Sequence, residues 1–470
     1  MAPKFGTSGL RGLVTDLTTE LVAAYVTAFV RACQMGEGVF VARDLRDSSP
    51  RIAGDVIAAA RAAGLRVTDC GATSTPALAL AAQSARAAAV MVTGSHIPAD
   101  RNGLKFYTPA GEITKAEEAA ILAALDQPPM PVREAGPLHR FDPGPDYVAR
   151  MRTAYGPNAL AGQRVGVWSH SAVGRDLLID TLRALGSEVI EIGRAETFLP
   201  IDTESVSPES RARLVSAAAE HGLAAIASTD GDGDRPLLAD ATGRVVPGDV
   251  LGQITARTLG ALVVVTPVSS NTGVAQMGFA QVIRTKIGSP FVIAGMDAAM
   301  AGGADRVVGY EANGGFLLGF DAHGPAGPLP RLLTRDSHLP IVAALIAAGT
   351  DGLAALVAQG PQRFTAADRL QEVPTARTTA LVAALAQNPT ALLTPLEAGE
   401  LQSLDQTDGL RLTLTSGRIV HLRPSGNAPE LRLYTEAERA DVAAALLVAF
   451  NASILSLLDR IMQEGLVRAN

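Results

Sequence analysis

The chain has 470 residues, which is too many for one ordinary hydrophobic core, and typical domain sizes predict about three or four domains. Its formal net charge of −7 is mild, and no basic stretch is dense enough to favour a nucleic acid as partner. The two cysteines, Cys33 and Cys70, match no metal or redox spacing, which fits a reducing compartment.

The N-terminal residues lack the apolar core of a signal peptide. We also expect no apolar run long enough to cross a membrane. These features predict a cytoplasmic protein with no membrane partner.

Short apolar runs alternate with Ala- and Leu-rich helical stretches for most of the chain, a pattern typical of α/β units. The first unit is predicted to contain a helix at 21–34, a strand at 38–42, a helix at 51–64 and a strand at 88–92. The Pro- and Gly-rich stretch 127–145 is predicted to be a linker.

Two further units of the same kind are expected after this linker. Strands are predicted at 164–168, 188–192 and 223–227, and then at 261–266 and 306–309. The last hundred residues differ, because 410–414 and 418–422 form a hairpin pattern around a Ser-Gly turn. A strand at 431–434 and a long amphipathic helix over 436–462 complete a smaller α+β domain.

Three carboxylates lie at alternate positions directly after the apolar run 223–227. Asp230, Asp232 and Asp234 are separated only by glycines, and in an extended or looping backbone alternate side chains point the same way. A hard divalent cation relieves the repulsion between converging carboxylates. The pattern therefore predicts a metal site.

A calcium-binding helix–loop–helix also spaces acids in this way. That loop needs Gly at its sixth position and Glu at its twelfth, where this chain has Arg235 and Ala241, so it is excluded. A solvated acidic turn remains an alternative, although a loop that follows a strand favours a ligand site.

Each of the first three units ends a strand with a small polar loop. The pairs of strand and loop are 88–92 with 93–96, 224–227 with 228–235, and 307–309 with 310–315. Three similar units could direct these loops into one shared cleft.

Ser95 lies between Gly94 and His96, where an exposed hydroxyl could act as a nucleophile, carry a phosphate, or only cap a turn. His96 is too close in sequence to serve as its base in a triad, so it could be a general acid or base, a hydrogen-bond donor or a plain loop residue. Lys105 is flanked by apolar residues and could be desolvated or solvated.

The segment 423–429 combines a cation, a hydroxyl, a glycine and an amide, which favour a phosphate-binding loop. These groups belong to Arg423, Ser425, Gly426 and Asn427. The segment 5–12 carries three glycines and Arg11 but does not match a P-loop. Glu311 and Asn313 could each hold sugar hydroxyls.

Together these loops resemble those of the α-D-phosphohexomutase family, the phosphomannomutases and phosphoglucomutases. Any one of the loops would be a weak match, but all five occur in the order of the family. They are 5–12 as the opening motif, 93–107 as the phosphoserine loop, 230–235 as the metal loop, 311–315 as the sugar-binding loop and 423–429 as the phosphate-binding loop.

The resemblance implies an α/β fold with four domains around a central cleft: three similar α/β domains with mixed sheets and a smaller C-terminal α+β domain. The expected domains are 1–145, 146–250, 251–365 and 366–470. The implied reaction interconverts hexose 6-phosphate and hexose 1-phosphate, with mannose phosphates preferred, through a phosphoserine enzyme and a hexose 1,6-bisphosphate that is both intermediate and activator. The implied ligands are sugar phosphates, and the implied assembly is a monomer or a homodimer.

The resemblance also implies a role for each site residue. Ser95 would carry the phosphoryl group, and its phosphate would share Mg²⁺ with Asp230, Asp232 and Asp234. Around the reacting phosphate the implied residues are Arg11, His96, Lys105 and Arg235, with Lys105 as proton acceptor. Those implied to bind substrate are Lys286, Glu311, Asn313, Arg423, Ser425, Gly426 and Asn427.

The chain departs from the family pattern at three places, none of which removes a metal ligand or the nucleophile. Ile97 stands where Asn is usual, and Asn427-Ala428 stands where Thr-Glu is common. Asn313 and Gly315 replace the more familiar Ser and His of the sugar loop. The sugar-loop change bears most on the identity of the sugar. A phosphoglucosamine mutase, which would share every phosphate and metal residue, is an alternative. Two further alternatives are a non-catalytic sugar-phosphate-binding protein and a metal-dependent phosphatase that uses Ser95.

Overall fold

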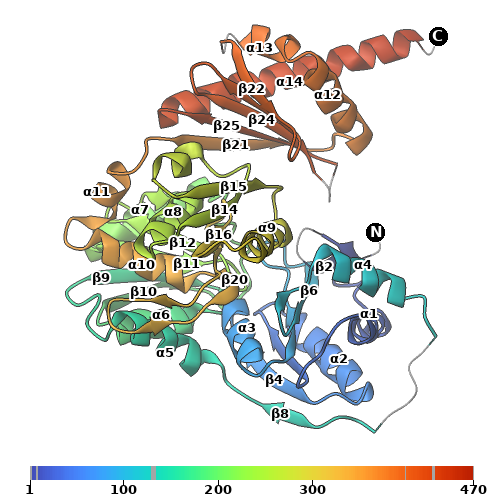
Figure 1. The fold of residues 1–470 in the computed structure, drawn as a ribbon, viewed down its shortest axis with the longest axis vertical. Helices are drawn as coiled ribbons and strands as arrows, with labels where there is room; N and C mark the ends of the chain where they lie inside the picture. Colours follow the sequence, from blue (N-terminus) through green and yellow to red (C-terminus); the bar gives the residue numbers. More distant parts are fainter. Residues whose placement is uncertain (1–2, 7–8, 129–133, 397–398, 426–428, 469–470) are drawn as a thin grey trace. The chain divides into compact units, whose positions relative to one another are not determined.

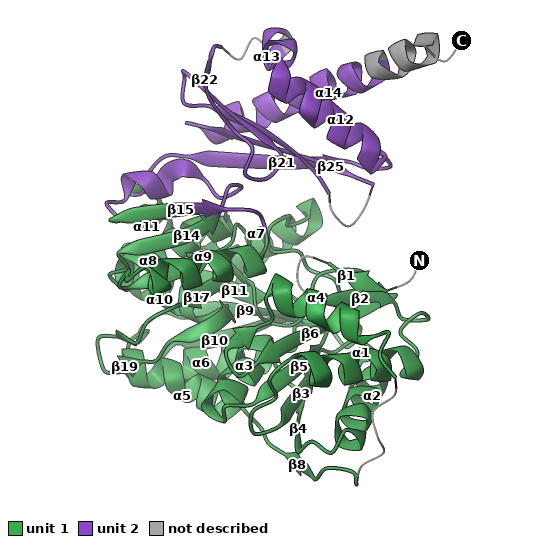
Figure 2. Ribbon diagram, turned by 45° about the vertical axis from the view of Figure 1, so that its right-hand side comes forward, with its two compact units in different colours: residues 1–266, 279–283, 288–359 green, residues 267–278, 284–287, 360–470 purple. Residues whose placement is uncertain are grey.

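The computed structural model describes residues 3–6, 9–128, 134–396, 399–425 and 429–468. The chain forms two compact units (Figure 2). Unit 1 comprises residues 1–266, 279–283 and 288–359, and unit 2 comprises residues 267–278, 284–287 and 360–470.

The first domain of unit 1 is a mixed sheet with helices on both faces (Figure 1). The strand order is β1-β2-β6-β5-β3-β4-β8, and β7 pairs with β6. Its strands are β1 Lys4–Phe5, β2 Leu10–Leu13, β3 Val39–Arg43, β4 Val67–Ala72, β5 Ala88–Val92, β6 Arg101–Thr108, β7 Gly111–Glu112 and β8 Leu138–Arg140. Its helices are α1 Thr19–Ala32, α2 Ser49–Ala62, α3 Thr75–Ser84 and α4 Lys115–Ala124.

The central strand β5 is buried on both faces, which explains its unbroken apolar sequence. Val90 belongs to the core that α1, α2 and α4 cover, whereas Met91 packs in the core that α3 covers. The alternation of the strand therefore fixes β5 between two layers of helices. Its carboxyl end leads directly into the loop that carries Ser95.

The predicted linker 127–145 contains a strand that sequence analysis did not identify. The short strand β8 pairs in parallel with β4 at the edge of the sheet. All three of its residues are exposed, so it has no alternation of apolar and polar residues to reveal it.

The second domain has a five-stranded mixed sheet in the order β10-β9-β11-β12-β13. Its strands are β9 Arg164–His170, β10 Glu188–Arg194, β11 Ala225–Thr229, β12 Pro236–Asp240 and β13 Val245–Val246, and its helices are α5 Gly144–Tyr155, α6 Arg175–Ala184 and α7 Pro208–His221. The antiparallel pair β11 and β12 is closed by residues 230–235, because Thr229 pairs with Pro236.

The third domain repeats this plan in the order β15-β14-β16-β17-β20. Its strands are β14 Val263–Pro267, β15 Gln281–Thr285, β16 Val307–Tyr310, β17 Phe316–Leu318 and β20 Leu332–Asp336, with the small pair β18 Ala322–His323 and β19 Pro328–Leu329. Its helices are α8 Gly248–Thr258, η1 Thr272–Gln276, α9 Ser289–Ala301, α10 His338–Ala348 and α11 Gly352–Ala358. Residues 311–315 close the hairpin of β16 and β17.

The expectation of three similar units, each with a polar loop after a strand, is confirmed. In each sheet a parallel strand turns into an antiparallel neighbour: β5 into β6, β11 into β12 and β16 into β17. The three candidate loops occupy these equivalent turns.

Unit 2 contains the smaller α+β domain, whose antiparallel sheet has the order β21-β25-β24-β23-β22. Its strands are β21 Phe364–Leu370, β22 Leu401–Asp405, β23 Leu410–Leu414, β24 Ile419–Pro424 and β25 Leu431–Ala437, and its helices are α12 Thr375–Gln387, α13 Thr390–Leu396 and α14 Ala440–Arg468. The predicted hairpin of 410–422 is confirmed as β23 and β24.

The expectation that no apolar run is long enough to cross a membrane is wrong for α14. By length and composition alone, Ala440–Asp459 passes that test, with a mean hydropathy of 2.0. This helix packs on β21 and β25, where Phe450 and Ile454 are fully buried, while Val448 is 72% exposed. Apolar residues therefore occur on the packed face and on the exposed face of the same helix, which raises its hydropathy.

Candidate active site

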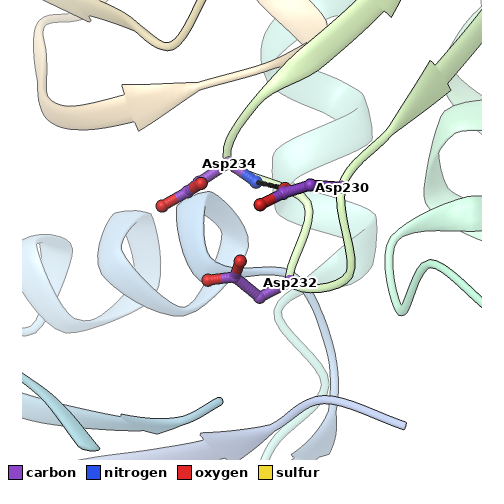
Figure 3. Close-up of side chains that lie close together, drawn as sticks. All are labelled: Asp230, Asp232 and Asp234. Atoms are coloured by element: carbon purple, nitrogen blue, oxygen red, sulfur yellow. Dashed lines mark hydrogen bonds between the residues drawn. The ribbon is translucent and has the colours of Figure 1, made fainter. Parts of the chain in front are cut away.

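The loop between β11 and β12 brings its three carboxylates together (Figure 3). Asp230, Asp232 and Asp234 are fully buried, and each offers an oxygen within 4.8 Å of the others. Asp230 Oδ1 accepts the backbone N–H of Asp234 at 3.2 Å and that of Arg235 at 3.3 Å. These two bonds fold the loop around the carboxylate of Asp230.

Gly231 allows this loop to lie against the loop that carries Ser95. A Cβ atom at Gly231 would lie 2.7 Å from the carbonyl oxygen of Ser95 and 3.0 Å from the ring of Phe198. Only glycine permits this approach of the two backbones.

Ser95 points its hydroxyl at the acidic loop. Its Oγ donates a hydrogen bond of 2.7 Å to Asp230 Oδ2 and lies 3.4 Å from Nδ1 of His96. The backbone φ of Ser95 is +56°, a left-handed conformation that L-residues rarely adopt. Two predicted site residues from different domains, Ser95 and Asp230, are therefore in direct contact.

The carboxyl groups of this region lie among several basic side chains. Lys105 Nζ lies 2.5 Å from Asp232 Oδ2 and 2.6 Å from Asp234 Oδ2. Arg235 donates from Nη1 to His96 Nδ1 at 2.8 Å, and its Nε lies 3.9 Å from Asp230 Oδ2. Two further basic residues of the region are Arg11, which lies on β2, and Arg335, which lies on β20.

Arg335 was not identified from the sequence. Its Nη2 lies 2.8 Å from Asp234 Oδ2, and its Nη1 donates to Glu311 Oε2 at 3.0 Å. One buried guanidinium therefore joins the metal loop to the sugar loop. Within the motif Leu332-Leu333-Thr334-Arg335-Asp336 it resembles any strand residue, so no sequence signal pointed to it.

Burial and neighbouring charges shift the pKa values of Asp230 and Asp232 in opposite directions. Burial, together with repulsion from Asp232 and Asp234, raises the pKa of Asp230 well above its ordinary value. Burial alone would also raise the pKa of Asp232, but Lys105, followed by Thr75 and Arg335, outweighs burial and lowers that pKa. The charged form of Asp230 is therefore disfavoured unless a cation binds beside it, whereas Asp232 is ionised beside Lys105.

The same forces act on two of the basic groups. Burial and the nearby charge of Arg235 lower the pKa of Arg11 to about 10. Burial, followed by the charges of Arg235 and Arg11, lowers the pKa of His96 far below its ordinary value. His96 is therefore a neutral imidazole that can accept a hydrogen bond.

The acidic loop fits a divalent cation. Among the described residues, Oδ1 of Asp232 and Oδ1 of Asp234 are buried without a hydrogen-bond partner, a costly state for carboxylate oxygens. A hard cation with oxygen ligands, such as Mg²⁺, would satisfy them. Asp230, Asp232 and Asp234 are the residues that would hold it.

The sugar loop is formed as expected, but its two candidate residues differ. Glu311 is buried and paired with Arg335. The side-chain oxygen of Asn313 accepts the N–H of Gly315 at 3.0 Å, and its backbone oxygen accepts from Thr203 at 3.3 Å. Asn313 therefore stabilises the loop itself.

The other predicted substrate residues belong to unit 2. Arg423 Nε lies 2.9 Å from Asp408 Oδ2, and the same oxygen accepts the backbone N–H of Ile287 at 2.9 Å. Asp408 therefore joins Arg423 to the segment that carries Lys286. Ser425 is buried, whereas Gly426 and Asn427 lie outside the described residues.

Thr75 also contacts the metal loop and was missed in the sequence. It begins α3, and its Oγ1 donates to Asp232 Oδ2 at 2.6 Å. The Ser-Thr-Pro motif at 74–76 signals a helix start, but it gives no sign of which carboxylate the threonine contacts.

The chain matches four family models that follow one another along its length. They describe phosphoglucomutase/phosphomannomutase alpha/beta/alpha domain I at residues 2–129, domain II at 145–243 and domain III at 247–364, followed by the C-terminal domain at 367–453.

Known proteins are similar to the whole chain. A phosphomannomutase of Sinorhizobium fredii is 44% identical, with 95% of this chain and 98% of the relative covered. A phosphomannomutase of Salmonella muenchen is 40% identical, with 97% and 96% covered. The solved structure of a putative phosphomannomutase from Thermus thermophilus aligns with a TM-score of 0.75 at 21% identity, covering 97% of this chain and 99% of that chain.

These matches, which span nearly the full length of both partners, agree with the three repeated domains, the smaller C-terminal domain and the arrangement of the loops. The chain belongs to the phosphoglucomutase/phosphomannomutase family.

Proposed function

We propose that the chain is a phosphohexomutase that interconverts mannose 6-phosphate and mannose 1-phosphate through a phosphoserine at Ser95. The observation that carries this proposal is the contact of Ser95 Oγ with Asp230 Oδ2 at 2.7 Å inside the buried charge cluster. Phosphoryl transfer depends on positioning and charge neutralisation more than on covalent chemistry, and this cluster supplies both.

The charges of the cluster suit a phosphoserine and a divalent cation together. The carboxyl groups of the three aspartates and Glu311 lie among the basic side chains of Lys105, Arg11, Arg235 and Arg335. A doubly charged phosphate on Ser95 and a doubly charged cation together add no net charge to this cluster. Mg²⁺ held by Asp230, Asp232 and Asp234 would stabilise negative charge on the transferring group.

In the proposed forward step, the bond between phosphorus and Ser95 Oγ breaks while a sugar hydroxyl forms a new bond to phosphorus. The hydroxyl proton passes through a base on the protein to Ser95 Oγ, which leaves as a hydroxyl. The hexose 1,6-bisphosphate then returns its other phosphoryl group to Ser95 Oγ, and the serine proton passes to the sugar oxygen that is released. Arg235 and Arg11 would neutralise the transferring group, since both lie in the cation cluster.

We propose Lys105 as the group that moves the proton. Its Nζ contacts Asp232 and Asp234, so it belongs to the network around the reacting serine. As the ammonium of these ion pairs it can donate a proton, and it accepts one only after losing its own. His96 is the second candidate, because Nδ1 of its neutral ring lies 3.4 Å from Ser95 Oγ. That nitrogen also accepts a hydrogen bond from Arg235, so it has to give up this bond before it can take a proton.

The remaining proposed substrate residues divide between binding the phosphate and binding the sugar. Arg423, Ser425, Gly426 and Asn427 would bind the phosphate that does not react, with Lys286 as a further contact. Glu311 would accept hydrogen bonds from sugar hydroxyls. Asn313 would act through the shape of the loop, since its side-chain oxygen is used within it.

Two measurements test this proposal. Intact-mass analysis should show one phosphoryl group on the purified protein or after incubation with hexose 1,6-bisphosphate, and Ser95→Ala should carry none. The same variant should lose isomerase activity by several orders of magnitude, because it lacks the group that carries the phosphate. Phosphate that persists on Ser95→Ala would place the nucleophile elsewhere.

Side-by-side assays on mannose, glucose and glucosamine phosphates separate the sugar alternatives. A phosphoglucosamine mutase would use the same metal and phosphate residues, so activity on the glucosamine compound alone would overturn the mannose assignment. Release of inorganic phosphate in place of isomerised sugar would indicate a phosphatase. Binding of sugar phosphates without either reaction would indicate a non-catalytic protein.

We also propose a cytoplasmic enzyme whose partners are sugar phosphates, with hexose 1,6-bisphosphate as activator and with no nucleic acid or membrane. The absence of a dense basic stretch supports the exclusion of nucleic acid. A monomer or a homodimer is the proposed assembly, and light scattering would distinguish the two.

A further inference from the structure

Arg46 is a fully buried arginine that lies outside the metal and sugar loops. It is 1% exposed, and Asp44 beside it is 0% exposed. A buried guanidinium is costly to desolvate unless its donors are satisfied. Burial indeed lowers the pKa of Arg46, so its contacts have to compensate for that cost.

The contacts of Arg46 converge on the backbone of the Ser95 loop. Its Nη2 donates to the carbonyl oxygens of Ser95 and Ile97, each at 2.8 Å, and its Nη1 donates to that of Pro98 at 2.9 Å. Its Nε donates to Asp44 Oδ2 at 3.1 Å. One guanidinium therefore fixes three peptide groups around the serine.

Asp44 holds the other side of the same loop. Its Oδ2 accepts from Thr93 Oγ1 at 2.7 Å, and Thr93 Oγ1 in turn accepts the backbone N–H of Ser95 at 2.8 Å. Ser49 Oγ donates to Asp44 Oδ1 at 2.5 Å and fixes that carboxylate to α2. Both backbone polar groups of Ser95 are thus tied to the pair formed by Asp44 and Arg46.

This arrangement explains two local features of the sequence. Gly94 is required because a Cβ atom there would lie 2.8 Å from the guanidinium carbon of Arg46. Ser95 adopts φ +56°, which is unfavourable for a serine unless its surroundings determine it. The hydrogen bonds on each side of Ser95 hold its backbone in this conformation.

The second domain covers the guanidinium. The guanidinium carbon of Arg46 lies 3.9 Å from the centre of the Phe198 ring, a distance at which a cation is attracted to an aromatic face. The same ring lies against Gly231 of the metal loop. Phe198 therefore contacts both the support of Ser95 and the loop that carries Asp230.

We propose that Arg46, anchored by Asp44, is the positioning residue that aims Ser95 Oγ at the metal loop. This inference rests on the proposed function, because it assigns Arg46 to the support of the phosphate carrier. Arg46 acts through the Ser95 backbone and does not itself take part in phosphoryl transfer.

The test compares Arg46→Lys with Arg150→Lys. Arg150 is a matched control in another part of unit 1, since it is also buried, pairs with Asp336 at 2.9 Å and donates to the carbonyl oxygen of Pro330 at 2.9 Å. Lysine keeps the charge at both positions but cannot bind several carbonyl groups in one plane. Both variants should therefore lose thermal stability.

The kinetic parameters should separate the two variants. Arg46→Lys should lower kcat by about 100-fold, the order expected for a displacement of a reacting atom by about 1 Å, with KM changed less than about threefold. Phosphorylation of Ser95 by hexose 1,6-bisphosphate, followed by quenching and intact-mass analysis, should slow to the same degree. Arg150→Lys should keep kcat and this phosphorylation rate within about threefold of wild type.

Thr93 provides a second test that does not remove a buried charge. Thr93→Val should reduce kcat because it removes the hydroxyl between Ser95 and Asp44, and Thr93→Ser should restore it. This pair keeps the inference testable if Arg46→Lys does not fold.

The outcomes distinguish the two proposals. If wild type never carries phosphate on Ser95, the proposed function fails. If wild type carries it, but Arg46→Lys and Thr93→Val transfer phosphate as fast as wild type or no more slowly than Arg150→Lys, only the positioning role of Arg46 is overturned.

Discussion

At the scale of single residues, the site depends on ion pairs that are removed from water. Arg335 is 2% exposed and contacts both Asp234 and Glu311. Such a pair contributes little net stability when intact, because desolvation offsets the attraction. Removing one partner is different, since it leaves a charge buried without compensation.

Arg335→Met should therefore destabilise the protein by about 3–5 kcal/mol, the usual cost of breaking a buried pair. Asp234 and Glu311 would remain close together without the cation that both contact. Thermal or urea unfolding followed by circular dichroism measures this loss. Arg439→Met is the control, because Arg439 pairs with Asp441 at an exposed position and its removal should cause no measurable change. Equal midpoints for the two variants would contradict the prediction.

Whether a site residue could be predicted depends on how far apart in the sequence it and its partners lie. Asp230, Asp232 and Asp234 were predicted as a cluster because their spacing alone makes them converge. Arg335 was missed because its partners lie on loops that only the folded chain brings near it. A single arginine within a strand pattern does not show which distant residues it will contact.

At the scale of elements, the reactive loops share one position in the fold. In each of the three mixed sheets described above, the loop follows a buried parallel strand and leads into an antiparallel one. Apolar strands such as β5 are visible in the sequence, so this part of the plan could be predicted. The exposed strand β8 could not be, since its residues carry no apolar pattern.

The start of α10 shows how an element can make stability depend on pH. His338 is buried, and its ring is tilted against that of Tyr147, with ring centres 4.6 Å apart. Thr181 Oγ1 lies 3.1 Å from its Nδ1, and Asp336 is nearby. Burial lowers the pKa of His338 to about 4. Between pH 6.5 and 4 the unfolded chain therefore takes up a proton that the folded chain does not, so stability falls as the pH falls through this window.

His338→Asn should lose less stability than wild type between pH 6.5 and 4, by roughly 3 kcal/mol for a shift of this size. Above pH 6.5 the two stability curves should run parallel. Unfolding midpoints measured across this range test the prediction, and the comparison with wild type removes the contribution of carboxylates that titrate in both proteins. Curves that stay parallel down to pH 4 would show that His338 takes up its proton in the folded state as well.

At the scale of the whole molecule, the proposed functions are divided between the two units. The residues proposed for chemistry lie in one unit, and those proposed to bind the phosphate that does not react lie in the other. Ser95, Lys105 and the three aspartates belong to unit 1, whereas Lys286 and Arg423 belong to unit 2. The division follows contacts rather than chain order, because residues 284–287 lie within the third family domain but group with unit 2. This grouping could not be predicted from the sequence, since it reflects contacts between distant parts of the chain, such as that of Asp408 with Ile287.

The two units should therefore respond differently to mutation, and Asp408→Asn tests this. Asp408 fixes both Arg423 and the backbone of Ile287, so its neutral variant weakens the support of the proposed phosphate-binding residues. KM for the hexose phosphate should rise about tenfold, the order expected for one weakened interaction with a charged group. The rate of Ser95 phosphorylation at saturating hexose 1,6-bisphosphate should stay close to wild type, because the residues proposed for that step lie in unit 1.

Asp368→Asn is the control, because it alters only an exposed contact with Asn451 and should change neither KM nor the phosphorylation rate. An Asp408→Asn variant that keeps the wild-type KM would show that unit 2 binds the phosphate without this support, whereas a slower phosphorylation of Ser95 at saturation would show that the chemistry is not confined to unit 1.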